Sequence, residues 1–234
     1  MNIFQPKSFF ELQFPPVMKL FAGVTNTWEA MTSLPEYIET IVKPKVLGEV
    51  EDGAWLEPGK VQLGEGSRVE RGAIIRGPSI IGQKTLIRSG AYIRPNVIVG
   101  DECIIGHGTE LRQSVIMNQT KLPHLNCIMV SIIGNRVTFG ACSATSSIVK
   151  EANEVKITVM DENGSKRLVS TGLARFGAII GDDFECGGHV FMKPGTVIGK
   201  KCKIDPLISL SGYIKAGSCI GQVSECFHVT QGSS

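Results

Sequence analysis

The sequence predicts an all-β protein built as a parallel β-helix, with a small α-helical cap at its N-terminus. Two patterns predict the β-helix. Aliphatic residues recur every six positions over two long stretches, and small residues recur four positions after them. The composition agrees, since 27 of the 234 residues are glycine and only 6% are aromatic. That profile suits repetitive β structure better than a helical globule.

The first stretch begins at Leu63 and continues in steps of six. Its aliphatic positions are Leu63, Val69, Ile75, Ile81, Ile87, Ile93, Val99, Ile105, Leu111 and Met117. The small positions are Ser67, Ala73, Ser79, Thr85, Ala91, Val97, Cys103, Thr109 and Val115. Neither a helical period nor simple alternation produces this spacing. Three hexads predict one triangular coil of about 18 residues, with the aliphatic residues inside and small residues where the chain turns.

The same period returns at Ile180, Cys186, Met192, Ile198, Ile204 and Leu210, with fragments at Ile133 and Phe139 between the stretches. We therefore expect the β-helix over residues 51–222 and a C-terminal tail over 223–234. Two segments fall off the period, near 119–131 and 148–177. In the second, "EVKITVMDENGSKRLVS" predicts a hairpin with "DENG" as its turn. Such excursions often carry function, although ordinary loop drift would produce the same pattern.

Residues 1–50 show a different pattern. In "NTWEAMTSLPEYIETIVKP", Trp28, Met31, Ile38 and Ile41 follow helical spacing, and Pro35 is expected to open a second turn or helix. A bare end of a solenoid exposes its core and strand edges. We therefore expect this region to cap the open end of the β-helix.

Charge and cysteine content exclude several classes of protein. The net charge is +2 with acids and bases interspersed, which disfavours a nucleic-acid partner. No apolar run approaches ~18 residues, so no membrane span is expected, and the start "MNIFQPKSFFELQF" lacks the features of a signal peptide. Seven cysteines without a C-x-x-C pair are expected to be reduced, in a cytoplasmic protein with no metal site.

Three arginines are spaced by one coil. Arg76, Arg94 and Arg112 each follow an inward aliphatic residue, so they should stack on one outer face about 4.8 Å apart. Stacked guanidinium groups repel one another unless anions lie between them. One interpretation is a phosphate site. The other is neutralisation by Asp or Glu of a cap, a loop or a neighbouring subunit.

The off-period segment after this column contains "KLPHLNC", and here the sequence resembles a known family. Arg94-Pro95, Arg112, "HLNCIMV", "TFGAC" and the later "TGLARFGAIIGDD" and "KPGTVIG" are similar to hexapeptide-repeat acyltransferases. The likeness is to the acetyltransferase half of the bifunctional glucosamine-1-phosphate N-acetyltransferase/UDP-N-acetylglucosamine pyrophosphorylase, as a stand-alone relative. It implies a left-handed β-helix.

The resemblance also implies a reaction, in which an acetyl group passes from acetyl-CoA to the amine of an amino-sugar phosphate in UDP-N-acetylglucosamine synthesis. His124 matches the base of the family, and a histidine suits that step because it can be neutral at cellular pH and still accept a proton. From the residues alone, the favoured interpretation of His124 is a turn residue after Pro123 that hydrogen-bonds locally. His107 lies inside a regular hexad and is interpreted as structural.

The remaining site residues also come from the resemblance. Arg94 and Arg112, with Arg76 in the same column, match phosphate-binding positions. The expected contacts to the coenzyme are Gly140, Ala141, Gly187, Gly188 and His189. The family forms trimers with the site between neighbours, and an apolar face of Ile128, Ile132 and Phe139 would be compatible with this.

Several motif positions depart from the family. Cys127 replaces a Tyr, Met129-Val130 a Gly-Asp pair, Thr138 and Ser147 two Asn residues, and Cys142 a Gly. These losses leave a second hypothesis, a non-catalytic β-helix that binds a sugar phosphate or nucleotide sugar or serves as a structural trimer. A third, a γ-type carbonic anhydrase, needs clustered histidines, and His107, His124, His189 and His228 are not spaced for this.

Overall fold

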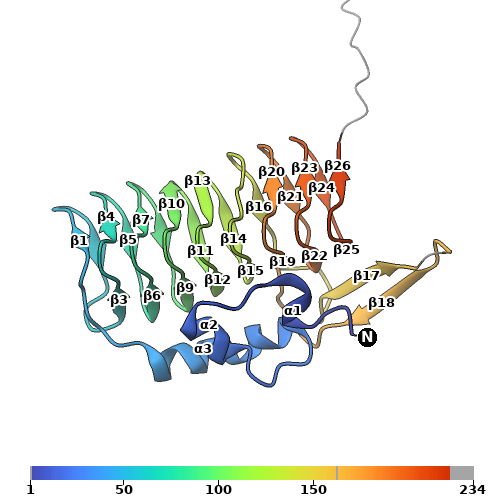
Figure 1. Ribbon diagram of the computed structural model, residues 1–234, viewed down its shortest axis with the longest axis horizontal. Helices are drawn as coiled ribbons and strands as arrows, with labels where there is room; N and C mark the ends of the chain where they lie inside the picture. Colours follow the sequence, from blue (N-terminus) through green and yellow to red (C-terminus); the bar gives the residue numbers. More distant parts are fainter. Residues whose placement is uncertain (1, 162, 222–234) are drawn as a thin grey trace, which may run out of the picture.

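In the computed structural model, which describes residues 2–161 and 163–221, the chain forms a parallel β-helix with three flat faces (Figure 1). Face A consists of β3 (Val61–Leu63), β6 (Ser79–Ile81), β9 (Val97–Val99), β12 (Ser114–Ile116), β15 (Ile132–Ile133), β19 (Ala178–Ile180), β22 (Thr196–Ile198) and β25 (Tyr213–Ile214). The predicted class, a parallel β-helix with short N-terminal helices, is confirmed. The predicted tail over 223–234 lies outside the described residues, as does His228.

The other two faces have the same construction. Face B consists of β1 (Glu49–Val50), β4 (Arg68–Val69), β7 (Leu86–Ile87), β10 (Ile104–His107), β13 (Lys121–His124), β20 (Glu185–Cys186), β23 (Lys203–Ile204) and β26 (Cys219–Ile220), with bridges at Thr138 joining its two parts. Face C consists of β2 (Trp55–Leu56), β5 (Ile74–Ile75), β8 (Tyr92–Ile93), β11 (Glu110–Arg112), β14 (Cys127–Met129), β16 (Ala144–Thr145), β21 (Phe191–Met192) and β24 (Ser209–Leu210).

The hexad positions fill the interior as predicted. Every aliphatic position from Leu63 to Leu111 belongs to the central core, and so do all six of the second stretch. Burial of each of these side chains stabilises the fold by about 25 cal/mol per Å² of apolar surface removed from water. Met117 is the exception, since its side chain packs outside the solenoid while Ile116 takes the inward position. The step from Leu111 to Ile116 is therefore five residues instead of six, and the step from Ile128 to Ile133 in the next coil is five as well.

The prediction that residues 119–131 leave the helix is wrong. Ile104 pairs with Lys121, 17 positions later, where Leu86 pairs with Ile104 at 18. The coil has lost one residue and otherwise continues, with β13, β14 and β15 in register on the three faces. Counting in steps of six loses the pattern after a one-residue deletion. The regular coil over residues 119–131 therefore looked like a break in the sequence.

The second predicted excursion does leave the solenoid. The chain departs after β16 and returns at β19, and between them β17 (Lys156–Met160) and β18 (Lys166–Ser170) form an antiparallel hairpin. Its turn closes through hydrogen bonds from the Ser165 and Asn163 N–H groups to the Asp161 carboxylate. The buried side of the hairpin packs with the N-terminal segment against face A.

The N-terminal helices lie along face A rather than over an open end (Figure 1), which corrects the expectation of an end cap. They are α1 (Pro6–Phe9), α2 (Pro15–Leu20), the 3₁₀ helix η1 (Thr27–Glu29) and α3 (Ala30–Ile41). The outward residues of face A, such as Ile98, Ile132 and Val197, form a second core with them. The apolar face that the sequence suggested for a trimer is therefore covered by the chain itself, and Ile128 and Phe139 point inward.

Pro35 lies inside α3 and does not open a new helix. A proline lacks the N–H that would bond the carbonyl four residues earlier. The Gln113 side-chain amide reaches that carbonyl, at Met31, over 3.4 Å. A residue of the solenoid thus satisfies the group that Pro35 leaves free, which keeps the helix continuous.

A buried carboxylate fastens the N-terminal segment to the solenoid. Asp182 is fully buried and accepts hydrogen bonds from the Glu11 N–H at 2.6 Å, the Asn135 N–H at 2.7 Å and the Asn135 amide at 2.9 Å. Burial raises its pKa, and these N–H groups oppose the rise. Next to it, the hydrogen bond from Arg136 lowers the pKa of Asp183. The segment is therefore held by polar contacts as well as by apolar packing.

Candidate functional site on face C

The three arginines stack as the spacing predicts. Ile75 pairs with Ile93 and Ile93 with Leu111, so Arg76, Arg94 and Arg112 follow one another along the edge of face C that adjoins face A. Met129 continues the column in the next coil, opposite Arg112. The column therefore carries three cations and then an apolar side chain.

The surroundings of the three arginines differ. Arg94 forms an ion pair with Glu110 at 3.1 Å, so a carboxylate of the adjacent coil neutralises it. The Arg76 guanidinium lies over the Trp55 ring, 5.7 Å from its centroid. The guanidinium of Arg112, a half-buried residue, forms no hydrogen bond or ion pair with any residue that the structure describes. It is the member of the column best placed to receive an external anion.

The two histidines stack at the ends of β10 and β13 on face B, at the corner where the chain turns onto face C. His107 and His124 are register partners on β10 and β13, because the shortened coil places His124 one layer above His107. Both side chains are exposed. The His107 Nδ1 lies 2.7 Å from the Ser89 carbonyl oxygen. When Nδ1 donates this hydrogen bond, Nε2 carries the lone pair and points away from the backbone.

Small residues continue the corner above His124. The Cys142 N–H bonds the His124 carbonyl at 3.1 Å, and the His189 N–H bonds the Ala141 carbonyl at 2.8 Å. The five predicted coenzyme residues thus occupy two successive coils directly above His124. Gly140 faces Gly187 so closely that a side chain on either would overlap backbone atoms of the facing coil or Pro206. Glycine at these two positions therefore allows the successive coils to pack closely at this corner.

The two edges lie on the same face but apart. From His107 the chain turns the corner at Gly108 and then follows β11 to Arg112, so the width of face C separates the histidines from Arg112. Tyr92, Glu110 and Cys127 lie between the edges on neighbouring strands. Burial raises the pKa of the Cys127 thiol, and the Glu110 charge adds to the rise. The thiol is therefore a poor nucleophile there.

The departures from the family motifs make this face more apolar. Val130 is buried against the N-terminal segment, and Met129 is partly exposed on the face. Cys142, which replaces a Gly, has φ of 60°, and Val130 has φ of 49°. A β-branched residue in this region is strained. The structure thus explains why a Gly suits the Cys142 position.

Sequence reasoning missed two members of the site. His107 seemed structural because it lies inside a hexad, and the 17-residue spacing that stacks it under His124 is visible only once the deletion is recognised. Glu110 precedes Leu111 and therefore points outward like every residue at that position of the repeat. Its distance of 16 positions from Arg94 is a usable signal for the ion pair.

Comparison with known proteins supports the resemblance. Residues 75–163 match the family described as the GMPPB C-terminal domain. Bifunctional protein GlmU of Methanocaldococcus jannaschii is 34% identical over 88 residues, which are 38% of this chain and 20% of that protein. The predicted resemblance is confirmed. A bifunctional sugar-1-phosphate nucleotidylyltransferase/acetyltransferase of Sulfurisphaera tokodaii is 33% identical over 90 residues, 38% of this chain and 21% of that protein.

The match to GlmU is partial, since the chain spans about a fifth of the length of these relatives. Among solved structures, a UDP-N-acetylglucosamine acyltransferase from Campylobacter jejuni covers 71% of this chain and 68% of its own at 15% identity, with a TM-score of 0.43. Within the described residues, no helix has the length and apolar character needed to cross a bilayer.

Proposed function

We propose that the protein is an acyl-CoA-dependent N-acyltransferase that acetylates an amino-sugar phosphate similar to glucosamine-1-phosphate. The observation that carries this proposal is the arrangement on face C. The exposed imidazole of His124, at the corner between faces B and C, adjoins the small residues of the next two coils, and the unpaired guanidinium of Arg112 lies at the other edge of face C. The matching GlmU proteins and the sugar-1-phosphate enzyme support a sugar-related acyl transfer.

The reaction requires one proton acceptor and no covalent intermediate on the protein. The amine nitrogen attacks the thioester carbonyl, a C–N bond forms and the C–S bond breaks. The amine proton passes to the imidazole of His124, and the departing thiolate takes up a proton to become the free thiol. A positioned general base typically contributes 10²–10⁴-fold to such a step.

His107 is the second candidate for the base. The resemblance selects His124, whereas the hydrogen bond from Nδ1 to the Ser89 carbonyl fixes the ring of His107 and not of His124. We propose that His124 accepts the proton and that His107, one layer below, supports its environment.

The corner above His124 is the proposed place of the acyl-CoA. Gly140, Ala141, Gly187 and Gly188 keep large side chains away from this corner. Their carbonyls already accept hydrogen bonds within the protein, whereas the Ala141 and Gly188 N–H groups form none within the described residues and can bond an extended pantetheine arm. His189 flanks the corner, exposed and with φ of 57°. Gly187 also lines a pocket of about 310 Å³ with Lys203 and Asp205.

A homotrimer would complete the site. His124 and Arg112 lie at opposite edges of the open face C, so a second surface is needed to enclose a sugar phosphate between them. Faces B and C carry no covering helix in the described part of the chain, whereas face A is occupied. We therefore propose that face C meets a neighbouring copy, in an enzyme of cytoplasmic UDP-N-acetylglucosamine synthesis.

The test is thiol release from acetyl-CoA with glucosamine-1-phosphate and a panel of other amino-sugar phosphates. Release that requires the acceptor is expected. No release with any acceptor, from protein shown to be folded, would favour the second candidate, a non-catalytic sugar-phosphate binder. The specific observation behind that candidate is the Arg94–Glu110 pair, which neutralises one of the two implied phosphate ligands.

Arg112 is expected to act in binding rather than in chemistry. In an active protein, Arg112→Met removes the unpaired cation and should raise KM for the sugar phosphate about tenfold, because a charge-assisted hydrogen bond is worth about 1.5–3 kcal/mol. The kcat should change little. Lys84→Met, which removes a cation at another corner of the solenoid, is the control. A fall in kcat at constant KM would contradict this role.

A further inference from the structure

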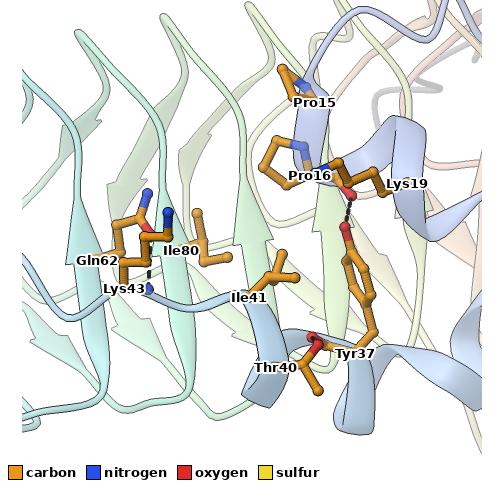
Figure 2. Close-up of a pocket in the computed structure, with 9 residues that line it drawn as sticks. All are labelled: Pro15, Pro16, Lys19, Tyr37, Thr40, Ile41, Lys43, Gln62 and Ile80. Atoms are coloured by element: carbon orange, nitrogen blue, oxygen red, sulfur yellow. Dashed lines mark hydrogen bonds between the residues drawn. The ribbon is translucent and has the colours of Figure 1, made fainter.

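We infer that the groove between the N-terminal helices and face A is a binding site for an aliphatic carboxylate. Figure 2 shows this groove, here called the helix–sheet groove, with side chains of α2, α3, the following linker and strands β3 and β6 around it. It lies on a different face from His124 and Arg112. The inference is therefore independent of the proposed acyl transfer.

The groove exists because the helices cover face A unevenly. Over the later coils, Ile98, Val115 and Ile132 are fully buried by the N-terminal segment. Over the first coils, the chain runs past the sheet as an extended linker, and Val46 and Leu47 remain 51% and 52% exposed. The result is a pocket of about 340 Å³ that shares five lining residues with a second pocket of about 430 Å³. The size is within the range of small-molecule sites.

The floor of the groove is aliphatic. Pro15 and Pro16 of α2, Ile41 at the end of α3 and Ile80 of β6 line the first pocket (Figure 2). Leu47 adds an exposed aliphatic side chain in the second pocket. Among the described residues, Tyr37 and Phe14 supply the only aromatic rings that line either pocket, so the surface fits an alkyl chain better than a planar base.

Positive charge borders this floor. Lys19, Lys43 and Lys45 line the two pockets, and their amines form no ion pair or hydrogen bond within the described part of the chain. No acidic residue among those described lines the first pocket. Glu65 and Asp101 line only the second, where the Asp101 carboxylate accepts the Gln83 N–H at 2.7 Å.

The other polar groups favour an acceptor ligand. The Gln62 side-chain oxygen already accepts the Lys43 N–H at 3.1 Å, which leaves its NH₂ group free to donate. The Pro16 carbonyl accepts the Tyr37 hydroxyl at 2.6 Å, and the Thr40 hydroxyl donates to the Tyr37 carbonyl at 2.7 Å. Both hydroxyl donors are therefore used within the protein, and the donors left for a ligand are the Gln62 NH₂ group and the lysine amines. Such a site suits a carboxylate that carries an alkyl chain.

The experiment is calorimetric titration of the full chain with decanoate, beside decanol and inorganic phosphate. Decanoate is expected to bind at least tenfold more tightly than either, because only decanoate has both the chain and the charge. Lys19→Met/Lys43→Met should weaken decanoate binding at least tenfold, and Lys60→Met, which removes a lysine paired with Glu57 outside the groove, should not.

The two substituted lysines, Lys19 and Lys43, are exposed, so the variant is expected to fold, and circular dichroism checks this. Equal binding of decanol, tight binding of phosphate alone, or decanoate binding unchanged by the double substitution would each overturn the inference. A failure of acetyl-CoA turnover would leave it standing, since the groove and face C are separate surfaces.

Discussion

His124→Ala is expected to lower acceptor-dependent thiol release at least 100-fold, because the attacking amine then has no positioned proton acceptor. His107→Ala should lower it about tenfold at most, since His107 lies one coil below. Both side chains are exposed, so both variants should fold like the wild type. The measurement is kcat/KM of purified wild type and the two variants, side by side.

Comparison of His124→Ala with His107→Ala decides which histidine accepts the proton. If activity collapses in His107→Ala and survives in His124→Ala, the ring held by the Ser89 carbonyl is the base, and the assignment that follows from the resemblance is wrong. If both variants remain fully active, neither imidazole accepts the proton. In that case face C is not the site of the chemistry.

Gly106→Ala is expected to lower the free energy of unfolding by about 3 kcal/mol. A Cβ at Gly106 would overlap the carbonyl of Pro123, in the coil directly above. The obstacle is backbone, so no side-chain rotation relieves it. Chemical denaturation of both proteins, compared at equal m-values, measures the change.

Gly172→Ala is the control for backbone strain. Gly172 has φ of 70°, and no described atom lies within 4 Å of the point that an alanine Cβ would occupy, so its substitution should cost only about 1–2 kcal/mol. A Gly106→Ala variant as stable as wild type would mean that Pro123 does not stack on Gly106. The segment 119–131 would then be the excursion that the hexad count predicted, and His124 would not lie above His107.

The sequence predicted the solenoid because every coil repeats the same packing and therefore the same pattern of residues. One inward side chain per hexad is enough to identify the core from Leu63 to Leu111 and from Ile180 to Leu210. The stacked arginines followed from the same arithmetic. Counting by six fails where a residue is lost, first between Leu111 and Ile116 and again between Ile128 and Ile133, because each loss shifts every later position by one.

Contacts between distant segments were not predictable in the same way. The N-terminal helices have an apolar side, but nothing in "NTWEAMTSLPEYIETIVKP" indicates whether it covers an end or a flank. The outward aliphatic residues of face A, Ile80, Ile98 and Val115, were the available signal. They are apolar at a position that would otherwise face water, which indicates a covered face. The hydrogen bonds that Asp182 accepts from Glu11 and Asn135 join distant parts of the chain, so no periodic pattern in the sequence indicates them.

The most direct test of the proposed acyl transfer is whether acyl-CoA binds the corner beside His124. Calorimetric titration with CoA compares the wild type, Ala141→Trp, which fills that corner from an exposed position, and Glu49→Trp, an equally bulky change on the outer side of face B. We expect CoA to bind the wild type and Glu49→Trp alike and to bind Ala141→Trp at least tenfold more weakly. CoA binding unchanged in Ala141→Trp, or undetectable in the folded wild type, would contradict this placement of the coenzyme.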